Sequence, residues 1–215
     1  MKFIVILLLA CACSGYRFTQ QDNPLAQYGV KTLSVPMFYN YSNFSEMSGH
    51  FTKEVFRLLT GYSGLKLKSG YHQDTDAVLI GIIKSPEKMM DSLTPGNLRV
   101  AQLRASEAIG EKRQKFYIPG TSEIRLSLQI ILIKKPTDEE LTLLRSGLSD
   151  KVLLTSKIIF NETLPLRSQF TREVFDKNEG LEVTGTQNAG IQRKVVRGLA
   201  EQAALSVRDM ILYAF

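Results

Sequence analysis

Cysteine, tryptophan and histidine are scarce in this chain of 215 residues. It has two cysteines, Cys11 and Cys13, no tryptophan, and two histidines, His50 and His72. Because no cysteine follows Cys13, no disulfide can form within the rest of the chain. Neither histidine has carboxylates around it at metal-ligand spacing. The sequence therefore predicts a domain without a disulfide, a metal site or a cofactor.

Motifs that mark common enzymes are also missing. There is no Walker loop, no Gly-x-Gly-x-x-Gly and no Gly-x-Ser-x-Gly. An enzyme of another kind would need a pocket that joins His50 or His72 to a carboxylate and a hydroxyl. We therefore expect a binding protein without catalytic activity.

The balance of charge is mildly basic, with a formal net charge of +6. Such an excess favours an acidic partner, for example an anionic lipid. The chain has no basic-aromatic RNA motif, no zinc-finger spacing and no arginine-rich run. Nucleic acid is therefore not an expected partner.

A run of about 20 apolar residues, as needed to span a bilayer, is absent. The chain begins MKFIVILLLACACSGYRF, in which eight apolar residues, 3–10, follow one lysine. This length is typical of the hydrophobic core of a secretory signal. The run ends in Leu8-Leu9-Ala10-Cys11, which resembles the bacterial lipobox, Leu-x-Ala/Gly-Cys. In that pattern the cysteine sulfur receives a diacylglycerol, and cleavage leaves the cysteine as the first residue.

Two cysteines are candidates for this lipidation. Cys11 has Leu8 and Ala10 at the matching positions, whereas Cys13 is the alternative and lies closer to the following GYRF stretch. A Cys-x-Cys pair in an unlipidated secreted protein is the other interpretation, although adjacent thiols suit neither a disulfide nor a metal site. No aspartate stands at the next-but-one position after either cysteine. We therefore expect a lipid anchor in the outer membrane, facing the periplasm.

The domain boundaries follow from this interpretation. Residues 1–10 are the predicted signal peptide, 11–29 the lipidated N-terminus and linker, and 30–215 a single domain. Hydrophobic periodicity predicts two main helices, over residues 46–60 and 191–211. A capping-box pattern, Thr137 followed by Glu140, predicts a short third helix up to residue 145.

The remaining pattern predicts strands and loops. Residues 77–83 form an almost unbroken apolar run, which indicates a central strand, and residues 124–133 alternate as in a half-buried strand. The other expected strands are 30–35, 65–68, 116–118 and 152–160. Residues 38–43, 85–112 and 163–188 are expected to be loops or polar connections. The fold class predicted is an α+β two-layer sandwich, with a mixed, mostly antiparallel sheet of four to six strands and both main helices on one face.

Three stretches resemble the LptE family, the lipopolysaccharide-assembly lipoproteins of the outer membrane. VKTLSVPMFYNYS (residues 30–42) resembles the family's I-x-x-L-x-V-P-x-F-x-N-x-T opening, and DAVLIGII (76–83) resembles its D-A-V-L-x-G-x-I strand. CSGYRF (13–18) is similar to the start that follows the family's lipobox. The chain departs from the pattern at residues 134–151, where it has an added helix in place of a short turn, and residues 86–115 match no motif.

The resemblance implies a plug without catalytic activity. Members of this family sit inside the outer-membrane β-barrel LptD, assist its assembly and help to deliver lipopolysaccharide to the outer leaflet. An accessory of a transporter or a regulator of peptidoglycan synthesis is the alternative, because both share an anchor and a small α/β domain. Basic side chains are the candidates for contacts with the lipid phosphates: Lys66, Lys68, Lys112, Arg113 and Lys115.

Overall fold

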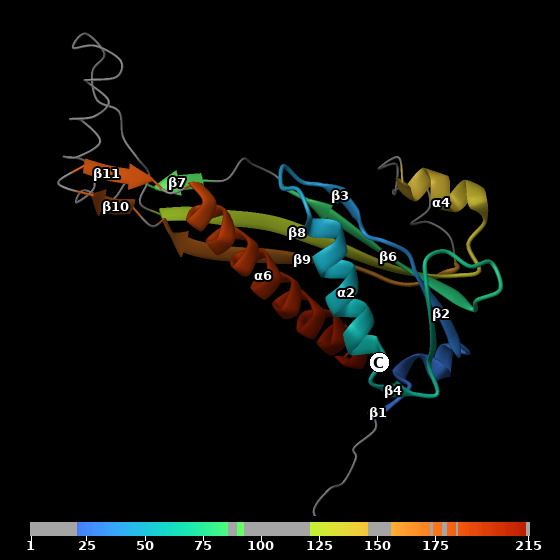
Figure 1. Ribbon diagram of the computed structural model, residues 1–215. Coiled ribbons are helices and arrows are strands. Elements are labelled where there is room, and N and C mark those ends of the chain that lie inside the picture. Colours follow the sequence, from blue (N-terminus) through green and yellow to red (C-terminus); the bar gives the residue numbers. More distant parts are fainter. Residues whose placement is uncertain are drawn as a thin grey trace, which may run out of the picture.

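A mixed β-sheet with two long helices packed on one face makes up the fold (Figure 1). The computed structural model describes residues 21–85, 90–92, 121–145, 156–172, 174–177, 180–183 and 185–213. The predicted signal peptide, both cysteines and the expected strand at 116–118 lie outside these residues.

The sheet changes from parallel to antiparallel at its central strand. Its strands are β2 (Thr32–Val35), β3 (Tyr39–Tyr41), β5 (Lys66–Ser69), β6 (Ala77–Lys84), β7 (Met90–Ser92), β8 (Thr121–Lys134) and β9 (Ile158–Thr171). On one side β5, β2 and β6 are parallel, and β3 continues along the same edge of β6. On the other side β8 pairs antiparallel with β6, β7 and β9. This arrangement confirms the predicted α+β class with a mixed sheet.

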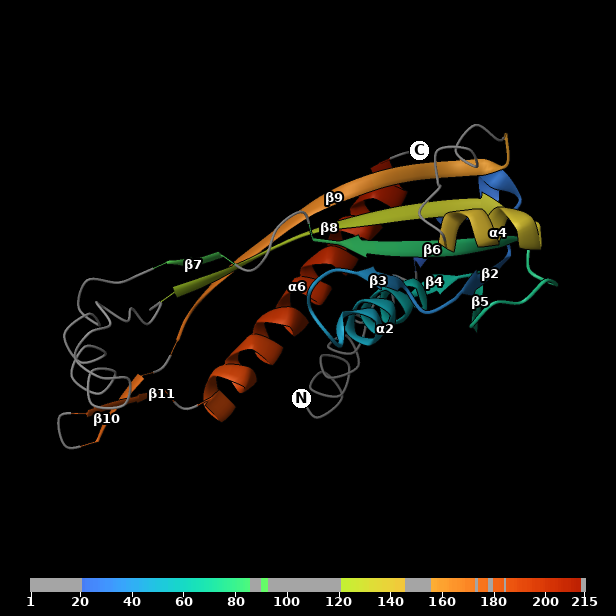
Figure 2. The ribbon, with the colours of Figure 1, turned by 90° about the horizontal axis from the view of Figure 1, so that it is seen from above.

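Shorter elements lie outside this sheet. The segment β1 (Gln21–Asp22) pairs in parallel with β4 (Tyr62–Ser63), and β10 (Val174–Lys177) pairs antiparallel with β11 (Gly180–Val183). The 3-10 helix η1 (Pro24–Tyr28) connects β1 to β2. Figure 2 shows the β10–β11 pair beyond one end of the long strands, far from α4 (Asp138–Arg145).

The two main helices cover the same face of the sheet. They are α2 (Met47–Leu59) and α6 (Gly185–Tyr213), and both contribute to one large apolar core. Phe51, Val55 and Leu59 of α2 are fully buried, as their spacing predicts. In α6, Ala200 and Ala203 are also fully buried. Their small side chains allow the helix to lie close to the sheet.

A second, smaller core lies on the opposite face, which we call the outer face. Val78, Ile80 and Ile82 of β6 point to this side and contact Leu141 and Leu144 of α4. The predicted capping box begins α4: the Thr137 N–H donates to Glu140 Oε2 at 2.7 Å, and the Glu140 N–H donates to Thr137 Oγ1 at 3.2 Å. The central strand is therefore buried on both faces, as its continuous apolar run predicts.

Three segments differ from the prediction. Residues 39–41, expected in a loop, form β3. The last long strand is Ile158–Thr171, which overlaps the expected strand 152–160 at residues 158–160, and residues 152–155 lie outside the described part of the chain. Much of the expected connection at 163–188 is therefore strand β9, followed by β10, β11 and the start of α6. The expected loop at 85–112 contains β7. Pro165 explains the largest error: proline inside a strand is tolerated only at a sheet edge, and β9 is such an edge among the described strands.

Candidate functional site

The predicted basic residues are only partly within the described structure. Cys11, Cys13, Lys112, Arg113 and Lys115 lie outside it. Lys66 and Lys68 lie on β5, which is an edge of the described sheet, and Lys66 is exposed. The Lys68 ammonium forms an ion pair with Asp74, and this hydrogen bond lowers the pKa of the Asp74 carboxyl. Lys66 and Lys68 are therefore together on one strand, and one of the two is already paired.

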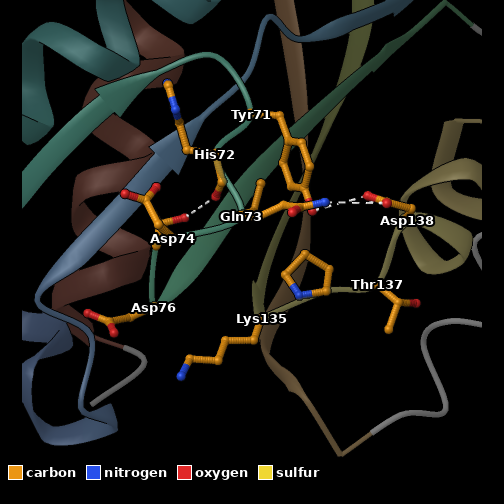
Figure 3. Close-up of a pocket in the computed structure, with 11 residues that line it drawn as sticks. Tyr71, His72, Gln73, Asp74, Asp76, Lys135, Thr137 and Asp138 are labelled. Atoms are coloured by element: carbon orange, nitrogen blue, oxygen red, sulfur yellow. Dashed lines mark hydrogen bonds between the residues drawn. The ribbon is translucent and has the colours of Figure 1, made fainter.

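A polar pocket of about 470 Å³ lies where the turn between β5 and β6 approaches the start of α4 (Figure 3). From the turn, Tyr71 and Gln73 point towards Asp138 at the first residue of α4. The Tyr71 hydroxyl and the Gln73 amide each lie 3.4 Å from a carboxylate oxygen of Asp138. Hydrogen bonds of this length are weak.

Asp76 lines the same pocket, but its carboxylate fixes the fold. Its Oδ2 accepts hydrogen bonds from the backbone N–H of Lys31 at 3.0 Å and of Thr32 at 2.8 Å, and from the Thr32 hydroxyl at 2.8 Å. These bonds hold the pKa of Asp76 below its usual value. Asp76, the first residue of the DAVLIGII motif, thus fastens β6 to the start of β2.

The histidine of this region is engaged with the backbone. Nε2 of His72 lies 3.0 Å from the Ser69 carbonyl oxygen, and the backbone N–H of His72 donates to Ser34 Oγ at 3.0 Å. Ser34 in turn donates to the Gly70 carbonyl at 2.5 Å. The polar groups that line the pocket are the carboxylates of Asp74, Asp76 and Asp138, the Gln73 amide and the Lys135 ammonium. The bonds of His72 and Ser34 hold the adjoining turn in place.

Phe38 and Asn40 belong to the other motif that supports the resemblance, VKTLSVPMFYNYS. The Phe38 ring is buried directly against Gly81 of the second motif. The side chain of Asn40 accepts a hydrogen bond from the Ser42 N–H at 3.0 Å and donates one to the Phe44 carbonyl at 2.6 Å. The two motifs therefore contact each other, and their characteristic residues stabilise the fold.

A cluster of cations on the outer face was not recognised from the sequence. Arg125 of β8 lies directly opposite Arg167 of β9, and Lys84 of β6 lies directly opposite Ser127 of β8. Glu123 forms an ion pair with Arg125 at 2.9 Å. The hydrogen bond from Arg125, together with the charge of Arg167, lowers the pKa of Glu123. Lys84, Arg125 and Arg167 form the group that we call the cationic face.

The sequence signal for this group is weak. Arg125 lies on the polar side of an alternating strand, which the pattern identifies correctly. Arg167 falls in a segment expected to be a connection, so its pairing with Arg125 depends on a strand register that the pattern does not give.

A smaller groove of about 160 Å³ separates the start of α2 from α6. Glu46 and Arg193 form an ion pair across it at 3.6 Å, and His50 lines it. In the described part of the chain, no group of three or more histidine, cysteine and acidic side chains is arranged to hold a metal ion. Within the same residues, no helix has the length and apolar character to cross a bilayer.

No protein-family model matches the chain, and no curated protein matches its sequence. Rare lipoprotein B from Shewanella oneidensis is similar in structure with a TM-score of 0.36 and 11% identity, over 84% of this chain and 92% of that chain. Lipoprotein GNA1162 from Neisseria meningitidis gives a TM-score of 0.35 and 11% identity, over 79% and 97% of the two chains. The PelC dodecamer from Paraburkholderia phytofirmans gives 0.33 and 9%, over 80% and 86%. TM-scores this low assign neither a family nor a function to the chain.

Proposed function

We propose that this protein is a lipid-anchored component of the outer membrane that binds an LptD-type β-barrel, assists its assembly and helps to deliver lipopolysaccharide. The anchor is placed on Cys11, or alternatively on Cys13, because the preceding Leu8-Leu9-Ala10 resembles a lipobox. Two or more acyl chains would give stable attachment, whereas one would give only marginal attachment.

The observation that carries the proposal is the contact between the two motif strands. The resemblance to the LptE family rests on residues 30–42 and 76–83, and these are the segments that the structure brings together. Asp76 binds the start of β2, and Gly81 lies against Phe38. Contacts of this kind require particular residue types at these positions. Both motifs contain those residues, and this supports a fold of the family's type.

The surface is also consistent with a barrel lumen as its environment. A barrel interior is polar, so a protein that fills it needs a polar surface over its own core. The described β9 presents exposed polar side chains along its outer face, including Thr163, Arg167 and Gln169. The anchor would keep the domain at a high effective concentration beside a membrane-embedded partner.

Affinity purification tests the barrel partner. The chain, tagged after its last residue, is expressed in its native cells, extracted from intact outer membranes after crosslinking, and analysed by mass spectrometry. We expect an LptD-type barrel among the crosslinked partners. Recovery of a transporter or of a peptidoglycan synthase in its place would reject the proposal.

The anchor is tested separately. Mass spectrometry of the mature protein is expected to find a diacylglycerol on Cys11 or Cys13, and the Cys11→Ser, Cys13→Ser variant is expected in the soluble periplasmic fraction. A bare sulfur at both positions in the unaltered chain would contradict the anchor.

A further inference from the structure

We propose that the cationic face of Lys84, Arg125 and Arg167 binds the headgroups of anionic lipids. The starting observation is the register of β8 and β9, which places Arg125 and Arg167 directly opposite each other on the outer face. Like charges in directly opposed positions destabilise a sheet, so the fold does not explain this pair.

The surrounding residues add to the positive charge. Lys84 is exposed on β6, one strand away, opposite Ser127, and Ser127 is the next outer-face residue of β8 after Arg125. Glu123 is the acidic side chain beside the pair and binds Arg125, which is 36% exposed. Three cations thus face one carboxylate, and Arg167 has no salt bridge to any residue that the structure describes. The group retains a net positive charge.

Lipid headgroups suit this face better than a free ion does. Arg167 is exposed and Arg125 is 36% exposed, and neither lines the two pockets described above. An ion pair with a single ion at such exposed positions contributes little. A lipid surface presents many phosphates at once, and each nearby Lys or Arg then strengthens binding by about fivefold. A guanidinium group also donates two parallel hydrogen bonds to two oxygens of one phosphate.

An aromatic side chain lies beside the cations. Tyr41 of β3 is directly opposite Lys84, on the same outer face, and is 49% exposed. Tyrosine is favoured where an apolar body meets polar headgroups. The outer face therefore combines phosphate-binding cations with a ring suited to the lipid interface.

This inference rests on the proposed function in one respect: the cargo proposed there, lipopolysaccharide, is an anionic lipid. The experiment uses the full chain carrying Cys11→Ser and Cys13→Ser, without any barrel. Binding is measured to vesicles of phosphatidylcholine alone and to vesicles with 30 mol% phosphatidylglycerol (about a third). The partition coefficient for the anionic vesicles is divided by the one for the neutral vesicles. This ratio removes the contribution of the apolar N-terminus, which is common to both measurements.

We expect this ratio to fall at least fivefold (roughly one cation's contribution) in the Arg125→Gln, Arg167→Gln variant. The matched control is Lys194→Gln, Arg197→Gln, which removes the same charge from exposed positions of α6, a helix on the other side of the sheet. Its ratio is expected to change less than twofold. Far-ultraviolet circular dichroism checks folding, and Arg167→Gln alone is used if the double variant is unfolded.

An equal fall in the control would show that only bulk charge matters and would overturn the proposal, as would an unchanged ratio in the Arg125, Arg167 variant. Inorganic phosphate is added as a competitor. Displacement by millimolar phosphate would identify a site for the free ion and reject the lipid assignment. None of these outcomes depends on the barrel, so a failure here is distinguishable from a failure of the proposed function.

Discussion

The ring of Phe38 lies so close to Gly81 that no other residue fits at position 81 without displacement. A Cβ atom at this position would lie 2.3 Å from Cδ2 of Phe38 and 2.4 Å from its Cγ. Phe38 belongs to the segment before β3 and Gly81 to the middle of β6. The glycine therefore allows the aromatic ring to cover the central strand.

Replacing this glycine tests the contact. Gly81→Ala is expected to destabilise the protein by about 1–3 kcal/mol, because the ring must move out of a packed core. Urea unfolding monitored by circular dichroism measures the free energy of unfolding. Gly49→Ala is the matched control: position 49 lies in α2, where a Cβ meets nothing within 4 Å, and alanine there is expected to stabilise by about 0.5–1 kcal/mol. Equal stability of Gly81→Ala and the unaltered chain would contradict the packing argument.

Asp76 is expected to make stability depend on pH. Its pKa is lowered in the folded state by the hydrogen bonds from Lys31 and Thr32, so its contribution is present at neutral pH. This contribution is lost as the pH falls below the unfolded value, near 3.9, and through the lower folded value. Asp76→Asn should therefore lower the unfolding free energy by about 1–3 kcal/mol at pH 7, and less at acidic pH.

Thermal melts of both proteins from about pH 7 to about pH 3 provide the measurement, because this interval includes the ordinary pKa of an Asp carboxyl. Glu201→Gln serves as the control, because Glu201 is an exposed carboxylate on α6. A difference between Asp76→Asn and the unaltered chain that stays constant with pH would count against the role of the ionised carboxylate.

The capping box of α4 provides another test. Thr137→Ala removes the hydroxyl that accepts the Glu140 N–H and is expected to cost about 1 kcal/mol. Glu140 also binds the Lys157 ammonium at 3.1 Å, so the start of α4 is connected to the approach to β9. Thr142→Ala, within the same helix, is the matched control and should cause no loss, because alanine favours a helix interior. Equal losses in both variants would show that the cap is not the cause.

The basic segment around residue 113 is expected to contribute to lipid binding. Reversing Lys112, Arg113 and Lys115 together should weaken binding to lipopolysaccharide at low salt, where screening is least, and leave the circular dichroism spectrum unchanged. The control reverses Lys53, Lys194 and Arg197, which are exposed on α2 and α6. Binding that remains unchanged at low salt would refute the prediction.

Elements with a strong hydrophobic period could be predicted from the sequence, and edge elements could not. The helices α2 and α6 and the strand β6 each bury a face or both faces, so their apolar spacing is sufficient. In β9, by contrast, exposed residues outnumber buried ones and Pro165 interrupts the run. Its strand conformation depends on the long ladder with β8, which is a contact distant in sequence.

The same limit applies to the candidate sites. Lys66 and Lys68 are recognisable because they alternate on one strand. The pair of Arg125 and Arg167 depends on the register of two strands, and the pocket of Tyr71 and Asp138 depends on how α4 packs. Such groups come together only in the tertiary structure, so no spacing along the chain reveals them.

The position of Gln21 sets how far the domain can move from a bilayer. Ten peptide units separate Cys11 from Gln21, and a fully extended tether of that length reaches at most about 35 Å. The end of α6 contacts η1, beside this first described strand (Figure 1), whereas β9 alone extends about 45 Å towards the β10–β11 pair. An acylated Cys11 would thus keep the η1 end near the inner leaflet, and it would let the opposite tip stand well away from the lipid.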